Sequence, residues 1–172
     1  MILTGKNISL RALEPSDIDV LYKWENDTSA WQLSNTLTPF SKHVLEQYLS
    51  VSHNDIYTTK QLRLVISDSD KRPVGCVDLF DFEPAHHRSG VGILISDKND
   101  RGKGYASETL DVFIPYCFNT LNLRQLYCNI TSDNEHSLAL FKKYGFQISG
   151  TKKQWIRHGN AWKDEHLLQL IA

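Results

Sequence analysis

An apolar run, a glycine-rich turn and a helical pattern follow one another near the middle of the chain, and this succession restricts the fold most. The run is Val91-Gly92-Ile93-Leu94-Ile95, and the turn is Asp100-Arg101-Gly102-Lys103-Gly104-Tyr105-Ala106. After the turn, apolar residues recur with the spacing of one helix face, at Leu110, Phe113, Ile114, Cys117, Phe118 and Leu121. The pattern therefore predicts a strand, a tight turn and then a helix.

A glycine turn at the start of a helix is suited to binding phosphate. Gly102 and Gly104 let the backbone pass close to a ligand with its N–H groups pointing inward. The first helical turn adds unpaired N–H donors and a partial positive charge, and Arg101 and Lys103 add full charges. The turn is neither a Walker loop, since no Gly-Lys-Ser/Thr occurs, nor the dinucleotide motif, since position 107 is Ser. Its position between strand and helix predicts a phosphate or pyrophosphate site.

Size, charge and cysteine content limit the classes of protein to which the chain can belong. At 172 residues the chain is expected to form one domain, residues 1–172, with a substantial core. A net charge of −1 does not favour nucleic-acid binding, and no apolar run approaches the ~20 residues that span a membrane. The start lacks the apolar region of a signal peptide. Three widely spaced cysteines, Cys76, Cys117 and Cys128, fit reduced thiols of a cytoplasmic protein better than a disulfide or zinc framework, so no metal site is expected.

Strands alternate with a few helices along the chain. Strands are predicted at residues 8–11, 62–66, 74–82, 88–95, 125–130, 146–156 and 162–171. Helices are predicted after Pro15, after an N-cap at Ser41, after the glycine turn, and at residues 135–144 before a C′ residue at Gly145. Residues 32–40 are expected to form a loop, and Pro115 to kink the long helix or remove one of its hydrogen bonds. The mixture indicates an α+β fold with an antiparallel meander across residues 62–95.

Three motifs resemble those of the GNAT-type N-acetyltransferases. The segment Arg101-Gly102-Lys103-Gly104-Tyr105-Ala106 is similar to the family's Gln/Arg-x-x-Gly-x-Gly/Ala signature. Asn134-Glu135-His136-Ser137, with Phe141-Lys142-Lys143-Tyr144-Gly145-Phe146 after it, is similar to the family's Asn-x-x-Ser/Ala helix. Gly159-Asn160-Ala161-Trp162-Lys163-Asp164 is close to a hairpin of the branch that contains the ribosomal-protein and spermidine acetyltransferases. The resemblance covers nearly the whole chain. It implies the GNAT fold, a mixed and mostly antiparallel sheet of six to seven strands, splayed at its centre and flanked by about four helices.

The resemblance also implies acetyl-CoA as the acetyl donor and assigns residues to it. The turn amides would hold the pyrophosphate, the edge of the preceding strand would pair with the pantetheine arm, and the Asn134 helix would complete the site. The expected cofactor-binding residues are Leu94, Ile95, Ser96, Arg101, Gly102, Lys103, Gly104, Tyr105, Ala106, Ser107, Asn134, Ser137, Phe141 and Lys142. For Lys142 and Lys143, phosphate contact and a solvated position are both open, and we favour the solvated position for Lys143.

The implied reaction transfers the acetyl group directly from the thioester to a primary amine, without an acetylated cysteine. An amine with a pKa of about 10.4 is almost fully protonated at pH 7, so a nearby carboxylate would help to remove its proton. Asp78 and Asp81 match acidic positions of spermidine-type members, and Asp78 is the candidate base, although each is also a candidate surface carboxylate. Trp24, Asp78 and Asp81 are expected to contact the acceptor, with core packing an equal alternative for Trp24. The pair His86-His87 is expected to face solvent.

Two family positions carry unexpected residues. A tyrosine that protonates the leaving thiolate in many relatives is replaced by Phe141, and a glutamate of some ribosomal-protein-type enzymes falls at Ile156. Ser137 matches a serine that serves as the acid in that branch, so it is the candidate acid, or else a small residue that lets the cofactor approach. Tyr144 is expected to pack. These departures keep two alternatives open, a non-catalytic acyl-CoA-binding module and a transferase for another acyl group.

The resemblance leaves the acceptor and the assembly open. Protein N-termini, polyamines and other small amines are all acetylated by similar enzymes, so a small-molecule or peptide amine is the expected partner, and neither nucleic acid nor membrane is expected. Relatives are dimers or larger rings, so a homo-oligomer is one expectation, and no heptad pattern in the sequence decides it.

Overall fold

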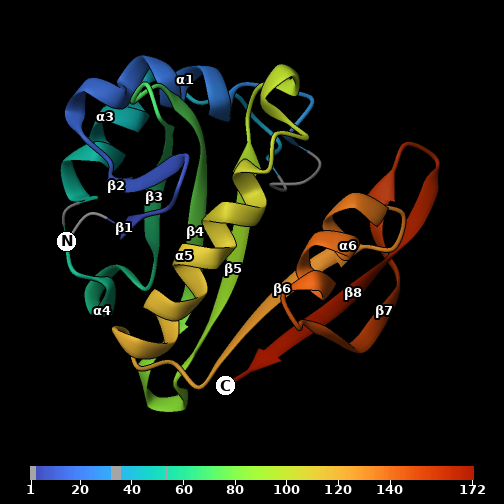
Figure 1. Ribbon diagram of the computed structural model, residues 1–172. Coiled ribbons are helices and arrows are strands. Elements are labelled where there is room, and N and C mark those ends of the chain that lie inside the picture. The colour runs from blue at the N-terminus through green and yellow to red at the C-terminus, as the bar shows by residue number, and fades with distance from the viewer. Residues whose placement is uncertain (1–2, 32–35, 53) are drawn as a thin grey trace.

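The computed structural model describes residues 3–31, 36–52 and 54–172, which form an eight-stranded sheet with helices on both faces (Figure 1). The strands are β1 (Leu3–Thr4), β2 (Ile8–Ala12), β3 (Leu62–Asp68), β4 (Pro73–Glu83), β5 (Arg88–Ile95), β6 (Gln125–Thr131), β7 (Gln147–His158) and β8 (Ala161–Ile171). The helices are α1 (Ile18–Glu25), α3 (Lys42–Val51), α4 (Ile56–Thr59), α5 (Tyr105–Asn119) and α6 (Glu135–Lys143). Short 3₁₀ turns lie between these elements: η1 (Pro15–Asp17) before α1, η2 (Pro84–His86) between β4 and β5, and η3 (Lys98–Asp100) between β5 and α5.

The α+β class predicted from the sequence is confirmed, with one more strand and one more helix than expected. The additional strand is β1, which spans two residues and pairs with β2. The additional helix is α4, a single turn whose N-cap Asp55 accepts hydrogen bonds from Tyr57 N and Thr58 N. Both elements are too short to show a periodic pattern in the sequence. Part of the loop expected at residues 32–40 lies outside the described residues.

The sheet splays where β5 meets β6. The strand order is β1-β2-β3-β4-β5-β6-β8-β7, and β5 and β6 pair in parallel while the other neighbours are antiparallel. The parallel register covers Arg88–Gly90 against Gln125–Tyr127, after which the two strands diverge (Figure 1). The rest of β5 pairs with β4 through Val91 to Ile95, so its other edge is free of β6. This is the splayed centre that the resemblance implied.

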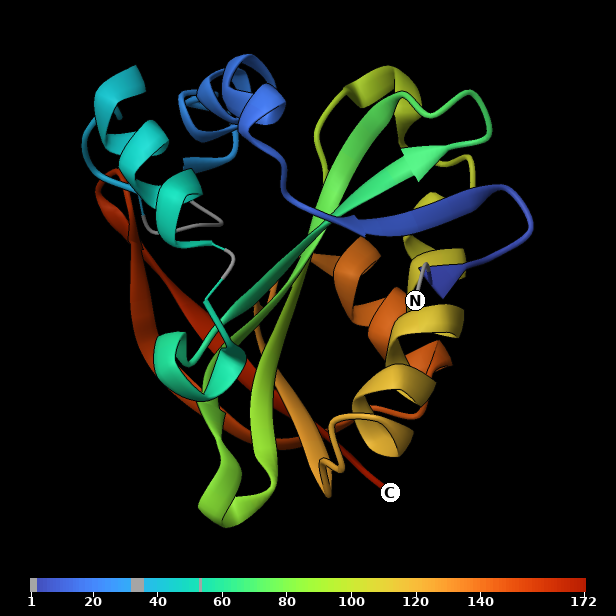
Figure 2. The same ribbon diagram turned by 90° about the vertical axis from the view of Figure 1, so that its left-hand side faces the viewer.

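The two faces of the sheet carry separate cores. Figure 2 shows α1 and α3 on one face and α5 and α6 on the other. Alternation along β3 and β4 separates the cores, since Val65 and Cys76 pack with α1 and α3, while Leu64 and Val77 pack with α5. Trp24 of α1 is 7% exposed and lies in the smaller core.

The predicted helix ends are confirmed by the capping contacts. Ser41 Oγ accepts a hydrogen bond from Val44 N at 3.2 Å, and Asn134 Oδ1 accepts one from Ser137 N at 3.2 Å. Gly145 follows α6 with a φ of 88°, the left-handed conformation of a C′ residue. Helix α5 continues through Pro115 to Asn119. No helix within the described ranges is long and apolar enough to cross a membrane.

Candidate active site

A cavity of about 150 Å³ lies where β5 and β6 separate. Its walls come from β5, from β6 and α6, and from the β7–β8 hairpin. The lining residues are Val91, Gly92, Ile93, Cys128, Asn129, Ile130, Thr131, Asn134, Ser137, Phe141, Ile156 and Glu165. The free edge of β5 therefore faces a hollow that an extended ligand can enter and pair with.

The two glycines of the turn adopt the left-handed backbone conformation, with open space beside them. Gly102 and Gly104 have φ values of 76° and 85°, and a Cβ built on either would meet no atom within 4 Å. Gly104 is the N-cap of α5 and offers no side chain to the first N–H groups of the helix. These donors and the concave side of the turn are thus open to an anion.

The two cations of the turn are engaged by the protein itself. Arg101 donates from Nε to Ile95 O at 3.1 Å and from Nη2 to Ser96 O at 3.3 Å, which ties the turn to the end of β5. Lys103 Nζ pairs with Asp100 at 3.0 Å. Both residues are predicted to contact the cofactor phosphates, and that prediction stands beside these contacts. In this structure their side chains hold the turn, and the Lys103 side chain is 50% exposed.

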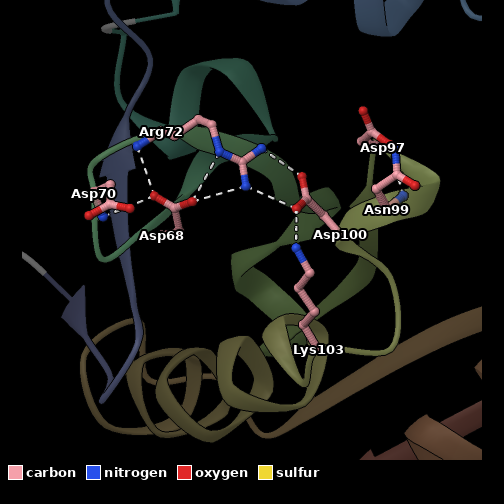
Figure 3. Close-up of polar contacts among 7 residues, drawn as sticks. All are labelled: Asp68, Asp70, Arg72, Asp97, Asn99, Asp100 and Lys103. Atoms are coloured by element: carbon pink, nitrogen blue, oxygen red, sulfur yellow. Dashed lines mark hydrogen bonds and ion pairs between the residues drawn. The ribbon is translucent and has the colours of Figure 1, made fainter.

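A network of charged residues fixes the turn to the distant β3–β4 connection (Figure 3). Asp100 is 4% exposed and accepts two hydrogen bonds from the Arg72 guanidinium, at 2.7 and 2.9 Å, besides the one from Lys103. Arg72 also pairs with Asp68 at 3.0 Å. Hydrogen bonds from Arg72 and Lys103 lower the pKa of Asp100 well below its usual range. Sequence reasoning missed this network, because no local pattern links residues 72 and 100.

The amino-terminal end of α6 presents two polar groups to the cavity. Asn134 uses its oxygen as the helix N-cap, so its amide N–H₂ group is left at the cavity wall. Ser137 lies one turn further, and in the described part of the chain its hydroxyl has no hydrogen-bond partner. Phe141 is 4% exposed and packs edge-to-face on Phe146 with centroids 5.0 Å apart, which makes this wall apolar.

The far end of α6 is tied to the start of α5. Tyr144 Oη donates to Ser107 O at 2.6 Å, and Lys143 Nζ donates to Ser107 Oγ at 2.8 Å. Lys142 and Lys143 are both exposed, which agrees with the solvated position that was favoured for Lys143. Lys143 also reaches the turn through its contact with Ser107. Tyr144 both packs and hydrogen-bonds.

Asp78 lies in an ion-pair cluster and is not a free base. Its two oxygens accept hydrogen bonds from Arg63 at 2.7 and 3.0 Å, and Arg63 also pairs with Glu25 of α1. Burial would lower the pKa of Arg63, but the Asp78 carboxylate raises it overall well above its usual value. Because a guanidinium engages both oxygens, Asp78 is poorly placed to accept a proton from an amine.

Asp81 is an exposed carboxylate and Trp24 is a core residue, which are the alternatives that the sequence left open for them. Asp81 has a φ of 48° in a bulge of β4 and accepts a hydrogen bond from Tyr127 Oη at 3.2 Å. Burial and the Asp81 carboxylate raise the pKa of Tyr127 to about 12. Tyr127 pairs with Gly90, so Asp81 lies near the closed end of the splay.

Trp24 is buried in the smaller core, so its side chain serves packing. His86 and His87 are exposed beyond that closed end, as expected.

Sequence reasoning also missed an acidic residue that lines the cavity. Glu165 of β8 is 9% exposed, and its carboxylate pairs with Lys152 Nζ of β7 at 2.5 Å. In the sequence, Glu165 directly follows Asp164, the last residue of the third motif. That position was the only indication that Glu165 belongs to the site. Cys128 lies on the same cavity wall, and burial raises the pKa of its thiol to about 12, which keeps it protonated.

The free β5 edge, the glycine turn at the start of α5 and the cavity between β5 and β6 together define an acyltransferase that binds an acyl-CoA thioester. The chain belongs to the GNAT acetyltransferases, since the Acetyltransferase (GNAT) domain matches residues 7–147. It is an acetyltransferase enzyme that takes its acetyl group from acetyl-CoA and passes it to an amine.

Several relatives are similar along most of the chain. Spermidine N(1)-acetyltransferase of Escherichia coli (strain K12) is 28% identical over 147 residues, which cover 86% of this chain and 76% of that protein. An uncharacterized N-acetyltransferase of Bacillus licheniformis, p20, is 24% identical over 172 residues, covering 98% and 95%. The crystal structure of spermidine N-acetyltransferase from Vibrio cholerae in complex with CoA and spermine has a TM-score of 0.86 at 23% identity and covers 96% of this chain and 95% of that chain. This last likeness establishes the shared fold.

Proposed function

We propose that this protein acetylates a primary amine of a polyamine or a similar small cationic amine, and that residues 1–172 act as one catalytic domain. The observation that carries the proposal is the cavity between the free β5 edge and the start of α6, with the glycine turn held at the carboxyl end of the same strand by Arg101. The single domain is supported by β8, which lies between β6 and β7 in the sheet and supplies Glu165 to the cavity.

The cofactor fits this site in an extended form. Its pyrophosphate would lie on the amides of residues 102–107, at the start of α5. Its pantetheine arm would pair with the β5 edge at Leu94, Ile95 and Ser96, and Asn134 would donate to it from the opposite wall. The thioester would then lie beside Gly92 and Ser137, both of which line the cavity. Phe141 would give this end of the site an apolar wall.

Transfer would be direct, with the protein acting mainly through orientation. Holding an amine against the thioester carbonyl supplies roughly 7 kcal/mol or more of effective molarity. Ser137, whose hydroxyl is unpaired in the described part of the chain, would give a proton to the leaving thiolate. Phe141 cannot take this role, because it has no ionisable group.

Two observations favour a cationic acceptor. The sequence relatives include spermidine acetyltransferases. Carboxylates also stand beside the splay, at Asp81 near its closed end and at Glu165 in the cavity wall. A protein N-terminus remains the second candidate, because it too is a primary amine.

The test combines a binding and a turnover measurement. Isothermal titration with acetyl-CoA should show binding, and release of free thiol should follow when spermidine, spermine or an N-terminal peptide is added. Turnover on the polyamines, with little on the peptide, supports the proposal. Binding without turnover on any amine would favour the non-catalytic acyl-CoA-binding module. If turnover requires a longer acyl donor, the transferase for another acyl group is favoured instead.

We also propose a cytoplasmic location and a homo-oligomer. Three buried free cysteines fit a reducing compartment. A Vibrio cholerae relative has been solved as a dodecamer. Light scattering of the purified chain measures the assembly directly, and a monomeric mass would contradict the oligomer.

A further inference from the structure

Lys152 occupies an ammonium site that the β7–β8 hairpin and β6 build around it. Its Nζ lies 2.5 Å from Glu165 Oε1, donates to Asn129 Oδ1 at 3.2 Å, and sits 5.0 Å from the centroid of the Trp155 ring. A buried carboxylate, an amide oxygen and an indole face are the groups that recognise a primary ammonium.

This ammonium site opens onto the cavity that would hold the acetyl group. Glu165 and Asn129 both line that cavity, together with Ser137. Glu165 pairs with Thr131 of β6 on one side and with Lys152 of β7 on the other. The Lys152 ammonium therefore contacts two residues of the cavity wall, where an acceptor amine has to arrive.

The position of Trp155, the third group of the ammonium site, depends on a bulge in β7. The register of β7 shifts between Lys152 and Ile156, and Gln154 has a φ of 49°. Asp164 holds this bulge, because its carboxylate accepts hydrogen bonds from Gln154 N and from Lys153 Nζ, both at 2.8 Å. The bulge brings Trp155 over Lys152. Asp164 is the end of the third sequence motif, so the motif has a structural role in building the ammonium site.

We propose that Glu165, with Asn129 and Trp155, binds the protonated amine of the acceptor, and that Lys152 fills this site until the acceptor displaces it. This inference rests on the proposed function and adds the residue that meets the reacting nitrogen. The Lys152 side chain is 36% exposed and has a flexible stem, so its ammonium can move into water. Glu165 has no such freedom, because it lies in the sheet and is nearly buried.

The proton balance gives Glu165 a chemical role. The bound ammonium gives one proton to the Glu165 carboxylate, and the freed electron pair of the nitrogen forms a bond to the thioester carbonyl carbon. The carbon–sulfur bond breaks, and sulfur leaves with its electron pair. Ser137 gives its hydroxyl proton to the sulfur and takes the second proton of the nitrogen in return, so the products are an amide and coenzyme A thiol and Ser137 is restored. Glu165 then returns its proton to water.

Two substitutions of the same ion pair give opposite results under this proposal. With saturating acetyl-CoA and spermidine as the varied acceptor, Glu165→Gln should lower kcat/KM by about 10²-fold, because the acceptor loses its carboxylate. Lys152→Gln should lower the KM for spermidine several-fold, because the competing ammonium is gone. If the pair served only to hold the hairpin, both substitutions would impair the enzyme in the same direction, and that result overturns the proposal.

The control is Lys6→Gln, which removes the same charge from an exposed position between β1 and β2, at the opposite end of the sheet from β7. Its KM for spermidine should stay at the wild-type value. An equal fall in KM would mean that net charge alone is responsible, which also overturns the proposal. Acetyl-CoA affinity should be unchanged in all three variants. Failure of the wild type to bind acetyl-CoA would count against the proposed function. If the wild type turns over normally but Glu165→Gln and Lys152→Gln do not change the kinetics in opposite directions, only the role of Glu165 is contradicted.

A second measurement does not depend on the variants folding. Lysine labelling with acetic anhydride, read by mass spectrometry with coenzyme A bound, should modify Lys152 faster relative to Lys6 when spermidine is present. Lys6, at the opposite end of the sheet, is the reference, because free spermidine also consumes the anhydride and slows the labelling of every lysine. Labelling of Lys152 that does not respond to saturating spermidine shows that the acceptor does not displace it.

Discussion

Gly104 shows at the scale of one residue how the backbone forms a ligand site. Substituting Gly104 by Val places a β-branched side chain at a φ of 85°, which costs roughly 1–2 kcal/mol for an L-residue, and directs it into the open side of the turn. We expect acetyl-CoA affinity to fall by about 10²-fold or more, or ~2.7 kcal/mol, in isothermal titration. Gly150→Val is the control, because its Cβ also meets open space but its φ lies outside the left-handed region. Equal affinities in the two variants would exclude the turn as the pyrophosphate site.

Ser137 is the residue whose chemistry the sequence left open between two roles. If its hydroxyl protonates the leaving thiolate, Ser137→Ala should lower kcat by about 10²-fold and leave the affinity for acetyl-CoA unchanged. If it only makes room for the cofactor, alanine serves equally well and kcat is retained. Steady-state thiol release decides between these results, with Ser132→Ala, an exposed serine just before α6, as the control.

At the scale of elements, the ion pairs of Asp100 connect the β3–β4 turn to the start of α5. The pKa of Asp100 is lowered in the folded chain by Arg72 and Lys103, so the folded state holds fewer protons at this carboxyl than the unfolded chain does. The stability it contributes is therefore present above the unfolded pKa of about 3.9 and is lost as the pH falls below it.

Asp100→Asn should consequently be less stable than wild type at pH 7, and the difference should shrink as the pH approaches 3. Thermal unfolding across this pH range measures it, and the weaker hold on the turn should also reduce acetyl-CoA affinity. Asp70→Asn is the matched control in the same turn, because there the contact to Asp68 is made by the Asp70 backbone N–H (Figure 3). If the difference in stability between Asp100→Asn and wild type does not change with pH, the ionised carboxylate of Asp100 is not the stabilising group.

Elements with a local pattern were predictable, and irregular elements were not. The β5 strand, the glycine turn and α5 follow from adjacent residues, and so do the caps at Ser41 and Gly145. The bulges at Asp81 and Gln154 depend on the pairing of one strand with another, and no neighbouring residue signals them. The ion pair of Asp78 was unpredictable for a related reason, since its partner Arg63 lies on the adjacent strand.

At the scale of the whole molecule, the site exists only because distant parts of the sheet meet. The splay was expected from the resemblance and not from any periodicity in the sequence. Glu165 was missed because its place in the cavity depends on the order β6-β8-β7, in which the last strand inserts between two earlier ones. The same order brings Asn129 within reach of Lys152.

The two parts of the sheet are joined through a short parallel register, and acetyl-CoA should strengthen that junction. Only Arg88–Gly90 and Gln125–Tyr127 pair across it in the described structure, while an extended cofactor would contact the free β5 edge on one side and Asn134 and Ser137 on the other. At a free concentration of 100 times the Kd, binding adds about 2.7 kcal/mol to the free energy of unfolding. For a chain of this size that corresponds to a rise in Tm of about 5–10 °C.

Amide hydrogen exchange should slow at the β5 positions after Gly90 that point toward the cleft, and remain unchanged in β2 on the far side of the sheet. Protection confined to the glycine turn, with β5 exchanging as before, would show that the pantetheine arm does not pair with this edge and that the cavity is not where the thioester lies.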